Sequence, residues 1–198
     1  MQRETNMAVY LAFLRGINVG AGNRIKMNDL WNVFQDLGFT DVQTYIQSGN
    51  VIFRSEMEDE QQIILQIEQA IQTSFGFRTT VVLRTAAEMS SIVSTVLQVS
   101  DKIAREDSSS SAFVFEYLHA ALFRGIPAAG ALDRLHDLKN GREAFLLVGR
   151  ELFLFLPDGF YSSKLAAGVQ KEGLHVTIRS WKTISNLEQT VQNLPVIN

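Results

Sequence analysis

Apolar positions along the first half of the chain recur with two periods, one typical of strands and one typical of helices. The 3.6-residue spacing of Leu30, Phe34 and Leu37, with Trp31 beside them, predicts a helix, and a second helix is predicted after Glu58. Short apolar or alternating runs predict strands at residues 8–14, 41–47, 51–55 and 79–85, with a tight turn at residues 48–50. A shorter helix is predicted near residues 88–96. The order is therefore β-α-β-β-α-β, followed by a helix.

The same order recurs in the second half, about 95–100 residues further on. Strands are predicted at residues 112–118, 144–148, 151–156 and 175–179, and helices at residues 132–138, 163–170 and from Trp181 onward. The polar segment 100–112, which contains four consecutive serines, separates the halves. We therefore predict two tandem units, at residues 7–100 and 111–198. The segments VVLRTAAEM and VTIRSWKTI echo each other, and LRGIN and FRGIP form a second, shorter echo.

Each β-α-β-β-α-β unit most naturally folds as a ferredoxin-like sandwich. This is an α+β fold with an antiparallel sheet in the order 4-1-3-2 and both helices on one face. The first strand is apolar on both sides, with Leu11 and Phe13 on one and Tyr10 and Leu14 on the other. We therefore expect protein to cover both faces of the sheets, either the second sheet or a second copy of the chain.

Composition excludes several kinds of site. The chain has no cysteine, which rules out disulfides, thiolate metal sites and a cysteine nucleophile and favours a cytoplasmic location. Its three histidines lack the spacing of helical zinc ligands, so no metal or cofactor is predicted. No apolar run is long enough for a membrane span. The net charge of −3 lacks the positive field of a general nucleic-acid binder, so binding of nucleic acid would require a local basic patch.

Several motifs are similar to those of a bacterial family known only as a domain of unknown function. They are LRGINVG, LGF, TYIQSGNVIF, FGF and VVLRT in the first half, and SKL and TIRSWKTISNL in the second. The resemblance covers nearly the whole chain from Met7 and implies two ferredoxin-like subdomains in tandem, with no established activity. The family pattern has Gly at position 21 and Asn at positions 180 and 182, where this chain has Ala21, Ser180 and Lys182. The chain keeps the pattern at Arg179, Trp181 and Thr183.

The loop after the first strand, FLRGINVGAGNRIKM, has three cations, three glycines and no acid. In a 4-1-3-2 sheet it lies at the same edge as the hairpin after the second strand, beside the N-terminus of the first helix. An arginine fork, amides, a hydroxyl and accessible backbone N–H groups suit a phosphate or carboxylate. We therefore predict an anion-binding site with Arg15 as its principal fork. The candidate residues are Arg15, Asn18, Arg24, Lys26, Gln47, Ser48 and Asn50.

Alternatives to this site stay open. The loop lacks the third glycine of a dinucleotide fingerprint and the Gly-Lys-Ser/Thr of a P-loop, and its glycines could serve only a turn. Arg84 and Arg179 each end a fourth strand before a helix, which favours a structural role. The acids Glu56, Glu58, Asp59 and Glu60 suit a first helical turn better than a metal. The histidines His119, His136 and His175 have no evident acid or nucleophile partner.

Three classes of function are compatible with the sequence. The first is binding of, or catalysis on, an anionic small molecule at the loop and hairpin edge. The second is RNA binding, because the RNA-recognition module shares this fold, although the strand NVIFRS lacks the Gly-Phe-Gly-Phe pattern of that module. The third is a non-catalytic interaction or regulatory module whose apolar sheet faces mediate assembly, including a homodimer. The fold alone does not decide among them, and the sequence does not determine whether a reaction is catalysed.

Overall fold

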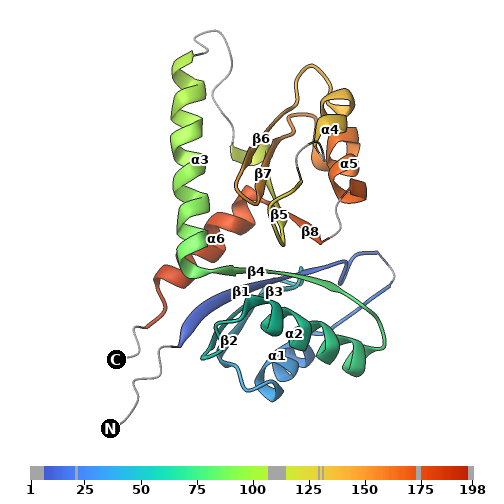
Figure 1. The fold of residues 1–198 in the computed structure, drawn as a ribbon, viewed down its shortest axis with the longest axis vertical. Helices are drawn as coiled ribbons and strands as arrows, with labels where there is room; N and C mark the ends of the chain where they lie inside the picture. The colour runs from blue at the N-terminus through green and yellow to red at the C-terminus, as the bar shows by residue number, and fades with distance from the viewer. Residues whose placement is uncertain are drawn as a thin grey trace. The chain divides into compact units, whose positions relative to one another are not determined.

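The structure of the protein is a computed structural model, which describes residues 7–20, 22–106, 115–128, 130, 132–172 and 175–195. These residues form two compact units, the first ending at Ala86 and the second beginning at Ala87. Each unit contains a four-stranded antiparallel sheet (Figure 1). Within the described ranges, no helix is both long enough and apolar enough to cross a membrane.

The first unit has the predicted ferredoxin-like topology. Its elements are β1 (Ala8–Arg15), α1 (Met27–Asp36), β2 (Thr40–Tyr45), β3 (Asn50–Ser55), α2 (Glu60–Phe75) and β4 (Thr80–Thr85). The sheet order is β2-β3-β1-β4, with β1 antiparallel to both of its neighbours. The apolar stripes of α1 and α2, which include Phe34 and Ile67, pack with Tyr10 and Leu14 of β1 in one core. The predicted order 4-1-3-2 and the placement of both helices on one face are therefore confirmed.

The opposite face of the first sheet is also apolar and buried. Leu11 and Phe13 of β1, Ile52 of β3 and Val82 of β4 have no exposed surface. They alternate with the side chains that face α1 and α2, as expected for a strand buried on both sides. Both faces of this sheet are therefore apolar, as the sequence predicts.

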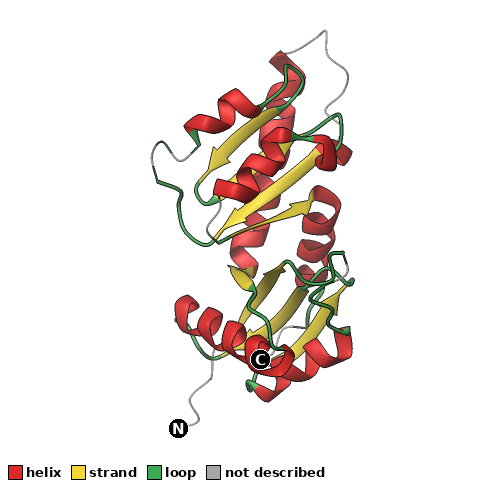
Figure 2. Cartoon of the chain, turned by 90° about the vertical axis from the view of Figure 1, so that its right-hand side faces the viewer, coloured by secondary structure: helices red, strands yellow, loops and turns green. Residues whose placement is uncertain are grey.

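The second unit repeats the topology with helices on both faces of its sheet. Its elements are α3 (Ala86–Glu106), η1 (Phe115–Tyr117), β5 (Leu118–Phe123), α4 (Asp133–Leu138), β6 (Ala144–Val148), β7 (Glu151–Phe155), η2 (Phe160–Ser162), α5 (Lys164–Glu172), β8 (Val176–Ser180) and α6 (Trp181–Gln192). The sheet order is β6-β7-β5-β8. Leu135 of α4 and Leu165 of α5 pack with Ala121 and Leu154 on one face, and α6 lies against β5 and β8 on the other. Figure 2 shows helices on both sides of the strands.

The first strand of the second unit differs from its predicted position. The sequence predicts a strand at residues 112–118, whereas β5 spans Leu118–Phe123 and the residues just before it form the short helix η1. Residues 112–114 lie outside the described ranges. The strand LHAALF contains two alanines and a histidine, which are weak strand formers. This strand lies between β7 and β8, and its Ala120 and Ala121 are fully buried. Packing between the two neighbouring strands, rather than β-propensity, therefore determines that these residues form a strand.

Helix α3 is longer than predicted and lies in the second unit. The sequence predicts a helix at residues 88–96 and a linker from residue 100, but α3 continues to Glu106. The end of this segment, DKIARE, includes strong helix formers that extend the helix despite its polar character. Arg150, at the turn between β6 and β7, forms an ion pair with Glu88 in the first turn of α3. The structure therefore divides the chain at Ala86, earlier than the predicted linker.

Candidate functional site

The loop between β1 and α1 is held in shape by the side chain of Asn18. Its Oδ1 accepts a hydrogen bond from the Ile25 backbone N–H at 2.9 Å, and its Nδ2 donates to the Ile25 carbonyl at 3.0 Å. The same Nδ2 donates to the carbonyl of Gln47 at 3.0 Å, across to the β2–β3 hairpin. Asn18 thus clips the two ends of the loop together and ties the loop to the hairpin.

Backbone contacts bring the loop and hairpin to one edge of the sheet. Phe13 of β1 pairs with Asn50 of β3, and the backbone N–H of Leu14 donates to the carbonyl of Gly49 at 2.8 Å. Gly49 adopts a φ of 71°, and a Cβ there would lie 2.7 Å from the Ile17 side chain. The close approach of loop and hairpin therefore requires glycine at this position.

The predicted site residues divide into structural and accessible groups. Asn50 is fully buried, and its Nδ2 donates to Ser48 Oγ at 2.7 Å, so its amide organises the hairpin. Arg24 is exposed and donates to the carbonyl of Gly20 at 3.3 Å within the loop. Exposed or half-buried side chains that can face a ligand are those of Arg15, Arg24, Lys26, Gln47 and Ser48. Asn18 and Asn50 act in the structure as loop and hairpin supports.

The start of β4 lies at the same edge and adds residues that the sequence analysis missed. Arg15 pairs with Thr80, and Thr79 Oγ1 donates to the carbonyl of Arg15 at 2.8 Å. Arg78 precedes this contact and is exposed. The predicted antiparallel pairing of the first and fourth strands already implies this position for Arg78, because an antiparallel strand starts where its neighbour ends.

The edge is basic and nearly free of acids. Three segments meet there, residues 13–28, 42–55 and 69–87, and none of them contains Asp or Glu. One acid of α2, Glu68, lies beside them: its Oε1 accepts a hydrogen bond from the Val81 N–H at 2.8 Å, and it lines a pocket with Arg78 and Thr79. Their cations at this edge are Arg15, Arg24, Lys26 and Arg78. Asp29, in the first turn of α1, is the acid next along the chain from the loop. Since the whole chain has 21 acids and a net charge of −3, this edge is a local exception to the charge of the protein.

The equivalent edge of the second unit is differently charged. The echo between LRGIN and FRGIP is structural, because the Phe123 N–H donates to the Arg150 carbonyl at 3.0 Å, as Leu14 does to Gly49. Arg124 is therefore the counterpart of Arg15. Arg150 replaces the hairpin glycine, and its Nη2 lies 2.6 Å from Glu88 Oε1.

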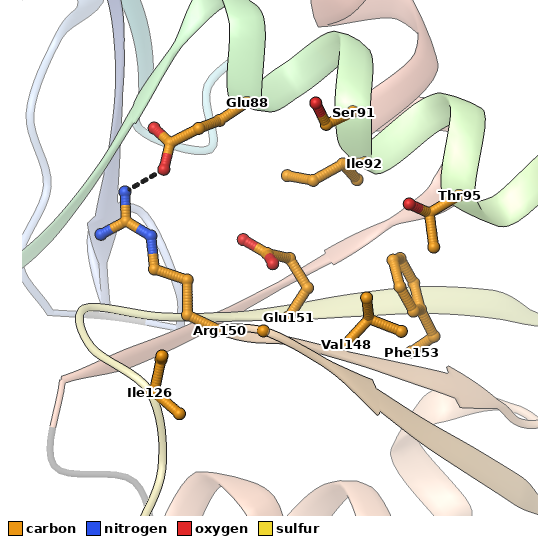
Figure 3. A pocket seen from close by; sticks show the side chains of 10 residues that line it. Glu88, Ser91, Ile92, Thr95, Ile126, Val148, Arg150, Glu151 and Phe153 are labelled. Atoms are coloured by element: carbon orange, nitrogen blue, oxygen red, sulfur yellow. Dashed lines mark hydrogen bonds and ion pairs between the residues drawn. The ribbon is translucent and has the colours of Figure 1, made fainter.

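A pocket of about 300 Å³ lies beside this ion pair, between α3 and the β6–β7 hairpin. Figure 3 shows the Glu151 side chain projecting into it beside Arg150, opposite Ile92. Val148 and Phe153 complete a largely apolar wall. Two acids, Glu88 and Glu151, therefore lie beside Arg150 at this edge, whereas the four cations of the first unit's edge have one neighbouring acid, Glu68.

The two strand-end arginines are structural, in agreement with the sequence analysis. Arg84 has no exposed surface, and its Nη1 donates to the Leu83 carbonyl at 2.7 Å. Arg179 Nη1 donates to Thr177 Oγ1 at 2.6 Å and to the Ile178 carbonyl at 3.1 Å. Desolvation lowers the pKa of Arg179 to about 10, so this side chain keeps its charge at neutral pH.

Asp59, before α2, and Ser180, before α6, cap their helices. Asp59 Oδ1 accepts from the backbone N–H groups of Gln61 and Gln62 at 2.9 and 3.2 Å. Ser180, at a position where the family pattern has Asn, accepts from the Thr183 N–H at 3.4 Å. Ala21, another departure from that pattern, lies outside the described residues. Among the residues that are described, no group of His, Asp and Glu is arranged to hold a metal ion.

Two of the histidines, His119 and His136, and the aromatic residues of the sheets serve packing. The His119 ring stacks on Phe160 with centroids 5.1 Å apart, and His136 packs on Phe145. Desolvation lowers the pKa of His119, and its contact with the Tyr117 carbonyl opposes the shift. Phe13 and Phe153, on the sheet faces opposite the helix pairs α1–α2 and α4–α5, are buried. They are therefore unavailable for the base stacking that an RNA-recognition module uses.

The fold and this edge define a tandem ferredoxin-like protein with a basic loop and hairpin surface in its first unit. The chain belongs to the family of proteins of unknown function DUF1697, whose family model matches residues 7–153. Its fold is similar to the structure of the conserved bacterial protein SP0830 from Streptococcus pneumoniae, with a TM-score of 0.70 and 20% sequence identity. That match covers 94% of this chain and 99% of the other. No curated protein matched the chain.

Proposed function

We propose that the first unit binds a small molecule bearing a phosphate or carboxylate group, at the edge formed by the β1–α1 loop and the β2–β3 hairpin. The observation that carries this proposal is the charge of the edge. Four cations lie at this edge beside one acid, Glu68, in a chain that is acidic overall. Cations that were only solvated and shared no ligand would not need to gather at one edge where acids are few.

The rigidity of the loop supports binding rather than a flexible turn. Asn18 clips the loop at both ends, and the Leu14 N–H ties it to the hairpin. Binding to a preformed site avoids the entropy cost of ordering a loop when the ligand arrives. Asn18 is uncharged, so this support adds no negative charge to the edge.

The groups suited to contact an anion come from the end of β1, from the β1–α1 loop and from the N-terminus of α1. Arg15 ends β1 and is half-buried, so its aliphatic stem is fixed while its guanidinium offers a bidentate fork. Arg24 and Lys26 are exposed on the loop. Lys26 is also the N-cap of α1 but makes no side-chain capping hydrogen bond, so the positive end of this helix adds to the field. A mono-anion or di-anion of small size fits this set.

The test is calorimetry with inorganic phosphate and with phosphorylated and carboxylated metabolites, alongside a thermal-shift screen of the same compounds. Arg15→Ala is expected to weaken binding about ten-fold to a hundred-fold, because a hydrogen bond to a charged group contributes about 1.5–3 kcal/mol. Arg124→Ala is the matched control, since it removes the equivalent arginine from the edge of the second unit. This control should bind as the wild type does.

Two results would contradict the proposal. The first is the absence of binding for every anion tested, with no thermal shift at high ligand concentration; saturation at a hundred times Kd should add about 2.7 kcal/mol of stability. The second is equal loss of binding in the Arg15→Ala and Arg124→Ala variants. An oligonucleotide in the same screen separates the RNA hypothesis, because its binding would depend steeply on salt.

A further inference from the structure

The edge strand β6 of the second sheet is apolar, regular and exposed. Its sequence is AFLLV, and it contains no charged or polar side chain. Leu146 is 41% exposed and Val148 is 37% exposed, while Phe145 and Leu147 pack on the core beneath α4 and α5. In the part of the chain that the structure describes, the sheet order gives β6 a single strand neighbour, β7.

Exposed edge strands are normally protected against pairing with another chain. The equivalent strand of the first unit, β2, shows such protection. Its sequence is TDVQTY, its pairing with β3 is interrupted by an irregularity between Thr40 and Gln43, and Asp41 within it has a positive φ of 49°. Charged and bulged edges resist addition of a strand. The two copies of one fold therefore differ at the same edge, and β6 lacks every one of these protections.

We propose that β6 is a homodimer interface, in which β6 of one chain pairs antiparallel with β6 of a second copy. The two sheets then join into one continuous sheet across a two-fold axis. This inference is independent of the proposed anion site, which lies in the other unit.

A second copy is the partner that the strand itself fits. Pairing centred on Leu146, the midpoint of β6, gives the greatest overlap and places Leu146 opposite Leu146 of the other copy. Ala144 then lies opposite Val148, and Phe145 opposite Leu147, so every pair is apolar and no like charges meet. A symmetric pairing of β2 would instead carry a carboxylate, Asp41, in each strand.

The first experiment measures mass in solution, by light scattering and sedimentation across a wide range of concentration. Wild-type protein should be a dimer. Leu146→Lys should shift the equilibrium to monomer by about ten-fold or more, because it removes the burial of a leucine and opposes two cations. Gln43→Lys is the matched control: Gln43 pairs with Ile52 as Leu146 pairs with Phe153, at the same place in each sheet. It should leave the mass unchanged, and circular dichroism should show both variants folded.

The second experiment uses the absence of cysteine from the chain, which makes any introduced thiol unique. Opposite residues of antiparallel strands lie about 4.5–5.5 Å apart between Cα atoms, within the range of a disulfide. Leu146→Cys should therefore form a covalent dimer under mild oxidation, and Gln43→Cys should not. A wild-type protein that is monomeric at all concentrations would overturn the proposal. This result would also be expected if β6 pairs only with a strand of a different protein. A dimer unaffected by Leu146→Lys, or equal cross-linking of both cysteine variants, would overturn the proposal as well.

Discussion

We predict that the three hydrogen bonds of the Asn18 side chain hold the β1–α1 loop in its conformation. Asn18→Gly removes its three side-chain hydrogen bonds but tolerates the backbone, since Asn18 has a φ of 55°. Asn18→Ala removes the same bonds and also places a β-carbon in the left-handed region. Comparing the two variants separates the hydrogen bonds from the backbone strain.

The expected magnitude follows from the three bonds. Each is worth about 0.5–1.5 kcal/mol, and the bond to Gln47 is exposed, which puts it at the low end. We expect Asn18→Gly to lower the free energy of unfolding by about 2 kcal/mol. Asn18→Ala should cost about 1 kcal/mol more, because a non-glycine residue is disfavoured in this conformation. Val19→Ala in the same loop is the control, because Val19 is 73% exposed and should change little.

The assay is urea denaturation together with amide hydrogen exchange. Exchange is needed because the loop can open without global unfolding, and the Ile25 amide reports directly on the bond to Asn18 Oδ1. If Asn18→Gly leaves both the unfolding free energy and the protection of the Ile25 amide as in the wild type, the clip does not hold the loop. The anion site would then not be preformed by Asn18.

Two further predictions concern stability. Gly49→Ala should destabilise the protein by about 2 kcal/mol or more, because Gly49 has a φ of 71° and an added Cβ would lie 2.7 Å from Ile17. Gly16→Ala shares that φ but meets nothing within 4 Å, so it should cost only about 1 kcal/mol in the same urea titration; equal losses would refute the steric account. The pKa of His119 is lowered from its usual 6.5, so the unfolded chain takes up this proton first as the pH falls. The free energy of unfolding should therefore decrease as the pH is lowered through 6.5. His119→Phe should flatten this dependence, and an unchanged slope would show that other groups cause it.

The pattern of apolar residues was sufficient for most of the fold because each unit repeats strong local signals. The stripe on α1, the turn between β2 and β3 and the strand β6 appear close to where the spacing predicts them. The pattern failed at β5, where alanines give a weak strand signal and burial between two neighbours decides. It also failed at α3, because a polar segment can continue a helix as readily as it can form a linker.

At the candidate site, the sequence by itself determined which segments meet. Strand direction in a 4-1-3-2 sheet brings Arg15, the hairpin and the start of β4 to one edge, and Arg78 follows from the same rule. Only the tertiary structure decided what each side chain does there. Asn18 and Asn50 appeared equivalent to the cations as ligand groups, yet both are occupied in holding the backbone. Hydrogen-bond partners far apart in sequence are set by three-dimensional packing, which residue type and spacing do not encode.

The same distinction applies to charge. The echo between LRGIN and FRGIP is visible in the sequence, but its meaning depends on the neighbours that each copy acquires. In the second unit Glu88, from a helix 62 residues earlier in the chain, pairs with Arg150 at the equivalent edge. In the first unit the corresponding hairpin residue is Gly49, and the edge keeps its positive charge. Electrostatic interactions act over distances of a few ångströms in space, so a duplicated motif can be neutral in one copy and basic in the other.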